Sequence, residues 1–143
     1  MNYKISYFAQ MRNFKSNVLP VSTAAWDQEW FRGIDRIDEL LIPLEAIEKL
    51  EKQRVMCQKD CKQTIPCAFM KEYKKYLDTL DFNNIIELLN SKVKSDKIDT
   101  IVLLVYEKPT TKCAERPVLQ EWFAEHGIEL AEWEKPNHKV SLI

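Results

Sequence analysis

The 143-residue chain contains only two glycines, Gly33 and Gly127. Phosphate-binding loops of the Walker and dinucleotide types need several glycines, because a glycine lets the backbone approach a phosphate closely. The shortage of glycine therefore argues against ATP-driven or NAD-type chemistry through loops of these kinds.

The sequence also lacks a long apolar run and an excess of charge of either sign. No run approaches the ~20 apolar residues that a membrane-spanning helix needs. The N-terminal segment 1–15 has charges within its apolar part and no small-residue cleavage site, unlike a signal peptide. With 21 basic and 22 acidic residues the net charge is −1, which gives no overall attraction to nucleic acid or acidic membranes. We therefore expect a cytoplasmic protein with no membrane partner, whose cysteines are thiols, metal ligands or redox groups.

Hydrophobic periodicity predicts a small number of strands in this chain. "IVLLVY" within segment 99–108 is apolar on both faces, as is typical of a central strand covered by helices. Pro20 removes a backbone donor from its strand, which indicates an edge position or a locally irregular strand. The predicted strands are 3–9, 17–23, 99–108 and 128–133, with a small additional strand at 139–143.

The remaining segments have helical periodicity. Asp81 is the expected N-cap of one helix, and Gly127 the expected C-terminal cap of another. The predicted helices are 24–33, a short one before Pro43, 43–56, 67–80, 81–94 and 116–126. The order of elements predicts a single α/β domain over residues 1–143. It has a mainly parallel sheet of four to five strands flanked by helices, and a cysteine-bearing insert around 57–67.

Ligands of parallel α/β sheets bind beyond the carboxyl ends of the strands, where the loops 8–13, 22–27 and 106–116 would meet. A small anionic molecule or nucleotide is the ligand class that these loops suggest. Arg116, Arg12 and Lys108 would make the charge contacts, and Ser22 and Thr23 would offer hydroxyls. The full set of candidates is Arg12, Ser22, Thr23, Trp26, Glu107, Lys108, Lys112, Cys113 and Arg116.

Cys113 and Arg116 stand directly before the predicted helix 116–126. The positive end of a helix dipole and the neighbouring Lys112 and Arg116 favour the thiolate form of a cysteine. Free N–H groups at a helix start, together with Arg116, could also hold a phosphate or carboxylate. The alternative is structural, with Cys113 packing as a small residue and Arg116 paired with Glu107 or Glu115.

Three more cysteines, Cys57, Cys61 and Cys67, fall within eleven residues. Their spacing matches neither a standard zinc ribbon nor a ferredoxin. Cys113 would complete a four-thiolate set that could hold zinc or an iron–sulfur cluster. The alternative is free thiols, or a redox-sensitive pair of Cys57 and Cys61.

Several segments resemble, in the same order, the bacterial and phage family called domain of unknown function 488. They are "YFAQMR", "NVLPVSTAAWDQEWF", "EYKKYLDTLDFNNIIELL" and "LLVYEKPTTKCAERPVLQEWF". Members of that family carry Cys-His-Arg in the last loop, with the arginine six residues before a helix tryptophan. Arg116 has this spacing to Trp122, whereas Cys113 is three residues before Arg116 and Ala114 and Glu115 replace the histidine. The resemblance implies a parallel α/β fold and a site at Cys113 and Arg116 without an established reaction. The lost histidine counts against a mechanism with an imidazole beside the thiol.

Three functions remain open from the sequence. The first is binding of a small anionic or nucleotide-like ligand at the carboxyl edge of the sheet, near Cys113 and Arg116. The second is a thiol-dependent, or metal- or iron–sulfur-dependent, enzyme acting on a nucleotide or nucleic acid. The third is a non-catalytic interaction module whose cysteine-bearing loop is held in place by a structural zinc ion.

Overall fold

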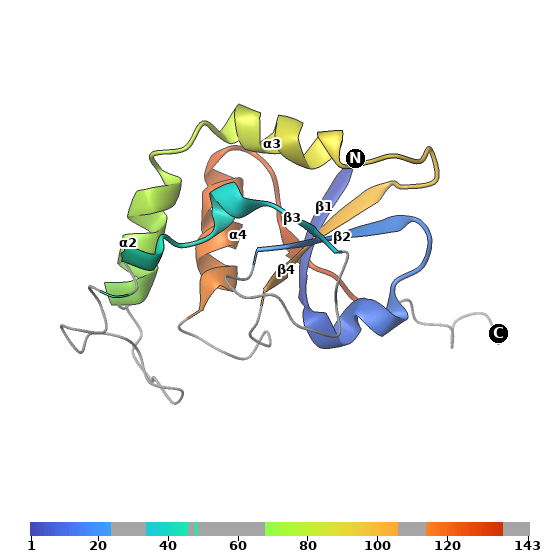
Figure 1. Ribbon diagram of the computed structural model, residues 1–143, viewed down its shortest axis with the longest axis horizontal. Helices are drawn as coiled ribbons and strands as arrows, with labels where there is room; N and C mark the ends of the chain where they lie inside the picture. The colour runs from blue at the N-terminus through green and yellow to red at the C-terminus, as the bar shows by residue number, and fades with distance from the viewer. Residues whose placement is uncertain (24–33, 46–47, 49–67, 106–113, 136–143) are drawn as a thin grey trace.

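The computed structural model describes residues 1–23, 34–45, 48, 68–105 and 114–135. Five parallel strands form one sheet in the order β3-β2-β4-β1-β5 (Figure 1). The strands are β1 (Asn2–Tyr7), β2 (Val18–Ser22), β3 (Asp35–Arg36), β4 (Thr100–Val105) and β5 (Ala131–Glu132). The helices are α2 (Ala68–Leu77), α3 (Phe82–Ser91) and α4 (Glu115–Glu125), and the 3-10 helices are η1 (Phe8–Asn13) and η3 (Asp38–Leu40). The predicted single α/β domain with a parallel sheet of up to five strands is confirmed.

Strand β4 is the centre of the sheet. All six of its residues are buried, and it pairs with β1 on one side and β2 on the other. An apolar strand of this kind is stable only where both faces of the sheet are covered. The central position predicted from "IVLLVY" is therefore correct.

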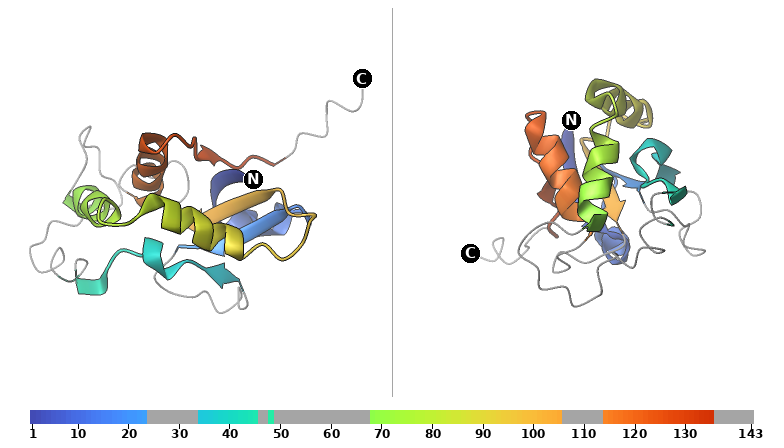
Figure 2. Two further views of the ribbon diagram at one scale, coloured as in Figure 1. Left: turned by 90° about the horizontal axis from the view of Figure 1, so that it is seen from above. Right: turned by 90° about the vertical axis from the view of Figure 1, so that its left-hand side faces the viewer.

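Alternate residues of the strands face α2, α3 and α4. Ile5 and Val21 both stand in register with Leu103, and all three belong to the main core cluster. The three helices contribute most of the other large side chains in that cluster, among them Tyr73 and Trp122. Helices α2 and α4 lie side by side over this face (Figure 2).

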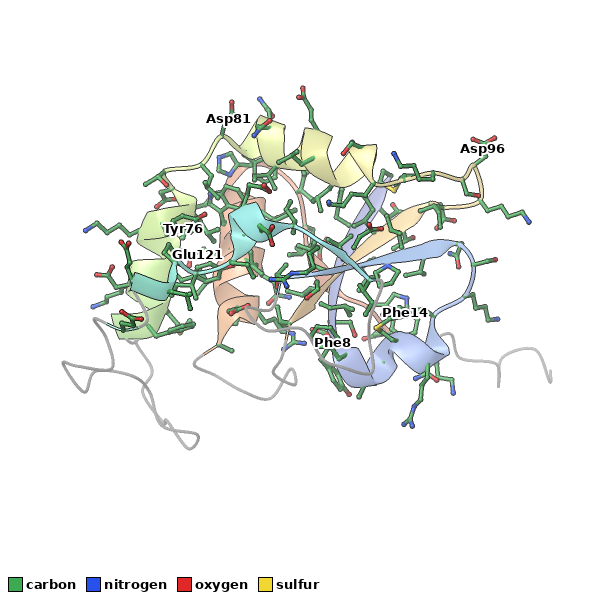
Figure 3. All side chains as sticks on the ribbon, in the orientation of Figure 1. Phe8, Phe14, Tyr76, Asp81, Asp96 and Glu121 are labelled. Atoms are coloured by element: carbon green, nitrogen blue, oxygen red, sulfur yellow. The ribbon has the colours of Figure 1, made fainter. Side chains whose placement is uncertain are left out.

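The opposite face of the sheet has a smaller apolar cluster around Val102 and Leu104. Phe8 and Phe14, at the two ends of η1, cover it (Figure 3). Phe14 also packs edge-on against Trp133, with ring centroids 4.6 Å apart. The helices α2, α3 and α4 and the 3-10 helix η1 therefore lie on opposite faces of the sheet.

Both predicted helix caps are present. The Asp81 carboxylate accepts hydrogen bonds from the backbone N–H groups of Asn83 and Asn84, at 3.0 and 3.4 Å, and so begins α3. Gly127 has φ of +84°, and its N–H donates to the Ala124 carbonyl while the N–H of Ile128 donates to that of Phe123. This is a Schellman motif, in which a glycine adopts the left-handed conformation at low cost.

The helix predicted between Ile34 and Pro43 is wrong. The segment forms β3 and then η3 instead. Its hydrogen bonds are long-range: β3 pairs with β2, while the hydroxyls of Tyr73 and Tyr76 on α2 donate to the carbonyls of Leu40 and Glu39. These tertiary partners outweigh the local helical periodicity.

Pro20 was predicted to mark an edge position or a locally irregular strand. Strand β2 lies inside the sheet, between β3 and β4, but Pro20 itself has no partner on β3. The Ser22 carbonyl accepts the N–H of Ile37, and alternation places the peptide nitrogen of Pro20 on the same side. Strand β3 pairs only with Val21 and Ser22. The backbone N–H that Pro20 lacks would therefore have had no acceptor on β3, because β3 begins opposite Val21. The strand predicted at 128–133 is also shorter, since β5 contains only Ala131 and Glu132.

Other predictions lie wholly or mostly outside the described residues. These are the helices 24–33 and 43–56, the insert around 57–67 and the strand 139–143. Among the described residues, no helix has both the length and the apolar character that crossing a membrane requires.

Candidate functional site at the carboxyl edge of the sheet

The topology marks one place on the sheet as a candidate site. From β2 the chain moves outward to β3, and from β4 it moves the other way, past β1 to β5. Because β2 and β4 are neighbours, their connections diverge from their carboxyl ends. In open parallel sheets such a switch point leaves a crevice in which ligands bind.

Buried polar residues gather at the carboxyl edge. Of the five buried polar or charged residues in the described part of the chain, Ser6, Ser22, Thr23 and Arg116 lie at this edge. The fifth, Thr100, lies at the start of β4. Burying a polar side chain costs free energy unless it is hydrogen-bonded, so this gathering requires a structural or functional reason.

Thr23 has a structural reason. Its backbone N–H and its hydroxyl Oγ1 both donate to the Leu104 carbonyl, each at 3.0 Å. The residue thus ties β2 to β4 at the switch point itself. Its hydroxyl proton is used in this bond, but Oγ1 can still accept a hydrogen bond.

Ser22 and Ser6 flank Leu104 on the opposite face from Thr23. Both serines are in register with Leu104, so the three side chains form one row across β2, β4 and β1. The Ser6 hydroxyl is fully buried and has no hydrogen-bond partner among the described residues. A buried hydroxyl in this condition is uncommon in proteins.

Arg116 occupies the first turn of α4 and is only 3% exposed. Its Nε donates to Glu132 Oε1 at 2.7 Å, and its Cζ lies 6.0 Å from the centroid of the Tyr7 ring. The guanidinium therefore lies over β1 and β5 and not over the switch point. Its ion-pair partner Glu132 follows it by sixteen residues, and the sequence offered no signal for this pairing.

Burial is the main influence on the Glu132 carboxyl and raises its pKa, while the charge and hydrogen bond of Arg116 lower it in part. The second oxygen of this carboxylate, Oε2, is buried without a hydrogen-bond partner in the described part of the chain. The pair joins the start of α4 to β5 and fixes the geometry of this corner of the sheet.

The predicted cations are not brought together. Arg12 is an exposed residue in the last turn of η1, on the opposite face of the sheet from α4 and Arg116. The other predicted site residues, Trp26, Glu107, Lys108, Lys112 and Cys113, lie outside the described residues. They belong to the two segments, 24–33 and 106–113, that connect to the carboxyl ends of β2 and β4.

The thiolate site predicted from Cys57, Cys61, Cys67 and Cys113 also lies outside the described residues. Within the ranges that the structure describes, no group of three or more histidine, cysteine, aspartate or glutamate side chains could hold a metal ion. The zinc or iron–sulfur site therefore stays a prediction. Metal content per chain in anaerobically purified protein tests it: a colourless, metal-free sample would contradict it.

Arg36 is a cation that the sequence analysis missed. It is in register with Ser22, so its side chain continues the row of Ser6, Leu104 and Ser22 onto β3. Its Nε lies 3.6 Å from Asp38 Oδ1, and its side chain is 29% exposed. The sequence predicted a helix for this segment, and a helix would not have placed Arg36 beside Ser22. Only the pairing of β3 with β2 brings the two residues together.

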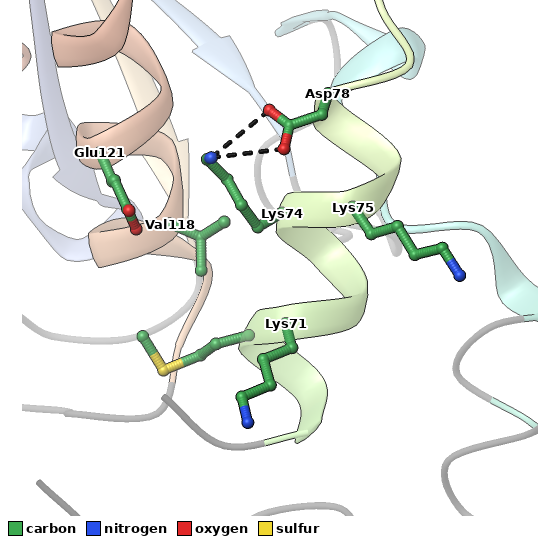
Figure 4. A pocket seen from close by; sticks show the side chains of 7 residues that line it. Lys71, Lys74, Lys75, Asp78, Val118 and Glu121 are labelled. Carbon is green, nitrogen blue, oxygen red and sulfur yellow. Dashed lines mark hydrogen bonds and ion pairs between the residues drawn. The ribbon is translucent and has the colours of Figure 1, made fainter. Parts of the chain in front are cut away.

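A pocket of ≈ 370 Å³ lies away from this edge, between α2 and α4 (Figure 4). Lys74 points into it and contacts Asp78 at 3.4 Å and Glu125 Oε2 at 3.0 Å. The hydrogen bond to Glu125 is the main cause of a raised pKa for Lys74. Lys75 extends away from α4 (Figure 4). The pocket contains none of the predicted site residues, and the contacts of Lys74 give it a role in joining the two helices.

Comparisons of the chain with models of known protein families, with curated proteins and with solved structures found no match. The resemblance to the domain of unknown function 488 family therefore stays a prediction. A function for this protein depends on the geometry at the carboxyl edge.

Proposed function

We propose that this parallel α/β protein binds a small anionic or nucleotide-like ligand at the carboxyl edge of its sheet, between β2 and β4. One observation carries the proposal: buried hydroxyl residues gather where the connections from two neighbouring parallel strands diverge. Ser22 ends β2 at this point, and Thr23 follows it directly.

The chemistry of the edge suits an oxyanion. A serine or threonine hydroxyl can donate to a phosphate or carboxylate oxygen and can also accept from a ligand hydroxyl. In the sequence, the segment after β2 carries Trp26, and the segment after β4 carries Lys108 and Cys113. An indole offers a surface for a base, and a lysine offers a positive charge for a phosphate.

Cys113 keeps the two roles inferred from the sequence, as a reactive thiol or as a metal ligand. A reactive thiol would make this edge the site of an enzyme acting on a nucleotide. The loop with Cys113 and Arg116 resembles that of the domain of unknown function 488 family, and we also propose that the chain belongs to that family.

Replacing Ser22 with alanine is expected to weaken binding of adenosine 5′-monophosphate by about threefold to tenfold, because one hydrogen bond to the anion is lost. Isothermal titration calorimetry on the wild type and the variant measures the change. Adenosine without its phosphate serves as the second ligand, and its affinity should change little on the same substitution.

Ser91→Ala is the matched control. Ser91 ends α3, near the amino edge of the sheet, and its hydroxyl donates to the Leu88 carbonyl. This substitution should leave the affinity unchanged. The proposal fails if the wild type binds neither inorganic phosphate nor the nucleotide, or if the two serine variants behave alike.

A further inference from the structure

A second pocket lies toward the amino edge of the sheet, on the face that η1 covers. We propose that this pocket binds a small zwitterion of the amino-acid type with an apolar side chain, at a site separate from the carboxyl edge. Its volume is ≈ 470 Å³, within the range of small-molecule sites. It is lined by residues of four neighbouring strands and by residues next to these strands: Lys4, Asn17, Val18, Thr100, Ala131, Glu132, Trp133 and Glu134.

Lys4 is a partly buried cation in the middle of β1. It is in register with Val102 on β4 and Ala131 on β5, and Val102 belongs to the apolar cluster on the η1 face. In the described part of the chain, Lys4 has no hydrogen-bond or ion-pair partner, whereas Lys74 and Arg116 both pair with carboxylates. A partly buried charge without a partner costs free energy. The carboxylate of a ligand would supply the missing partner.

Two neutral polar side chains are held in place in the same pocket. Asp99 Oδ1 accepts hydrogen bonds from Thr100 Oγ1 at 2.7 Å and from Asn17 Nδ2 at 3.0 Å. The Asn17 backbone carbonyl also accepts the N–H groups of Asp99 and Thr100. The second amide proton of Asn17, its Oδ1 and the lone pairs of Thr100 Oγ1 remain available to a ligand. Because these groups are already ordered, little entropy is lost when they bind.

The charges at the pocket favour a zwitterion over a nucleotide. The Glu132 carboxylate is paired with Arg116. Glu134 is exposed and has no ion-pair partner among the described residues. The unpaired charges of the lining are therefore one of each sign, on Lys4 and Glu134, and they match a ligand with one carboxylate and one ammonium group. A doubly charged phosphate would be repelled by Glu134, whereas an ammonium group would be attracted to it.

Trp133 provides the apolar wall of the pocket. Its ring is partly buried and packs edge-on against Phe14, with centroids 4.6 Å apart, which fixes the position of the indole. Val18 and Ala131 add apolar surface to the lining. An indole offers a large flat surface to an apolar or aromatic side chain. L-Phenylalanine is therefore a suitable probe, because it has both charges and an aromatic side chain.

Titration of L-phenylalanine into ¹⁵N-labelled protein tests the inference and should shift the amides of Asn17, Thr100 and Trp133. Two further probes, 3-phenylpropanoate and 2-phenylethylamine, each lack one of the two charges. Lys4→Met should weaken the binding of L-phenylalanine and of 3-phenylpropanoate by about tenfold or more, and should not weaken that of 2-phenylethylamine. Glu134→Gln should weaken the binding of L-phenylalanine and 2-phenylethylamine by about twofold to fivefold and strengthen that of 3-phenylpropanoate. Because Glu134 is exposed, this variant tests the inference even if Lys4→Met does not fold.

Lys71→Gln is the matched control. It removes one positive charge from an exposed position on α2, on the opposite face of the sheet, and should change the affinity for each probe less than about twofold. The inference is overturned if L-phenylalanine at about 10 mM shifts none of the three amides. It is also overturned if Lys4→Met binds L-phenylalanine as well as Lys71→Gln does, or if Glu134→Gln weakens the binding of 3-phenylpropanoate. None of these outcomes bears on the binding of adenosine 5′-monophosphate at the carboxyl edge, so each proposal can fail without the other.

Discussion

Replacing Arg116 with methionine is expected to lower the free energy of unfolding by about 3 kcal/mol at neutral pH. The change leaves the Glu132 carboxylate half-buried without the partner of its Oε1, and its Oε2 has no hydrogen bond in the described part of the chain. A buried charge that loses its partner costs more than the pair was worth. Urea unfolding at pH 7 measures the loss.

The loss should depend on pH in a defined direction. Burial raises the pKa of Glu132 above its usual 4.5, so the folded protein binds this proton more tightly than the unfolded chain. Stability therefore falls as pH rises from about 4.5 through the folded-state pKa. Without Arg116 that pKa rises further, so the fall should be larger and extend to higher pH in Arg116→Met than in the wild type.

Glu132→Gln and the double variant complete a thermodynamic cycle. Glutamine removes the titration, so the double variant should lose the added pH dependence. A loss below 1 kcal/mol in Arg116→Met, or an unchanged pH profile, would contradict the structural role of the pair.

Replacing Trp122 with alanine is expected to cost about 4 kcal/mol, because the side chain is fully buried at the centre of the main core. The Phe82 ring packs edge-on against it, with centroids 5.0 Å apart. The cavity would lie between α3 and α4. Urea unfolding with an unchanged m-value would show that only stability has changed.

Trp122→Phe should cost much less, about 2 kcal/mol or less. The indole Nε1 is buried and has no hydrogen-bond partner among the described residues, so phenylalanine removes a polar group that contributes nothing. Trp133→Ala is the control from the other face of the sheet. Trp133 is only partly buried, and its removal should cost less than that of Trp122. The reverse order would contradict the placement of the main core.

The features that the sequence predicted well depend on local information. The apolar run of β4, the N-cap Asp81 and the cap Gly127 are each encoded within a few residues. The parallel arrangement of the sheet followed from the alternation of strands and helices along the chain.

The features that the sequence missed depend on contacts between distant segments. Strand β3 exists because Val21 and Ser22 pair with Asp35 and Arg36, which helical periodicity around it cannot reveal. The pairing of Arg116 with Glu132 likewise needs β5 to lie beside β1. Both differences changed the candidate site. The unpredicted strand brings the cation Arg36 beside Ser22, and the unpredicted ion pair gives Arg116 a half-buried partner, Glu132.

Chemical-shift mapping with adenosine 5′-monophosphate tests the central claim most directly. We predict that the largest changes among the described residues fall on the amides of Ser22, Thr23 and Arg36, where β2 meets β3 and β4. The amides of Asn17 and Asp99, at the amino edge of the sheet, should not move. Changes centred on the amino edge or on the pocket between α2 and α4, or no changes at all, would contradict a ligand site at the carboxyl edge.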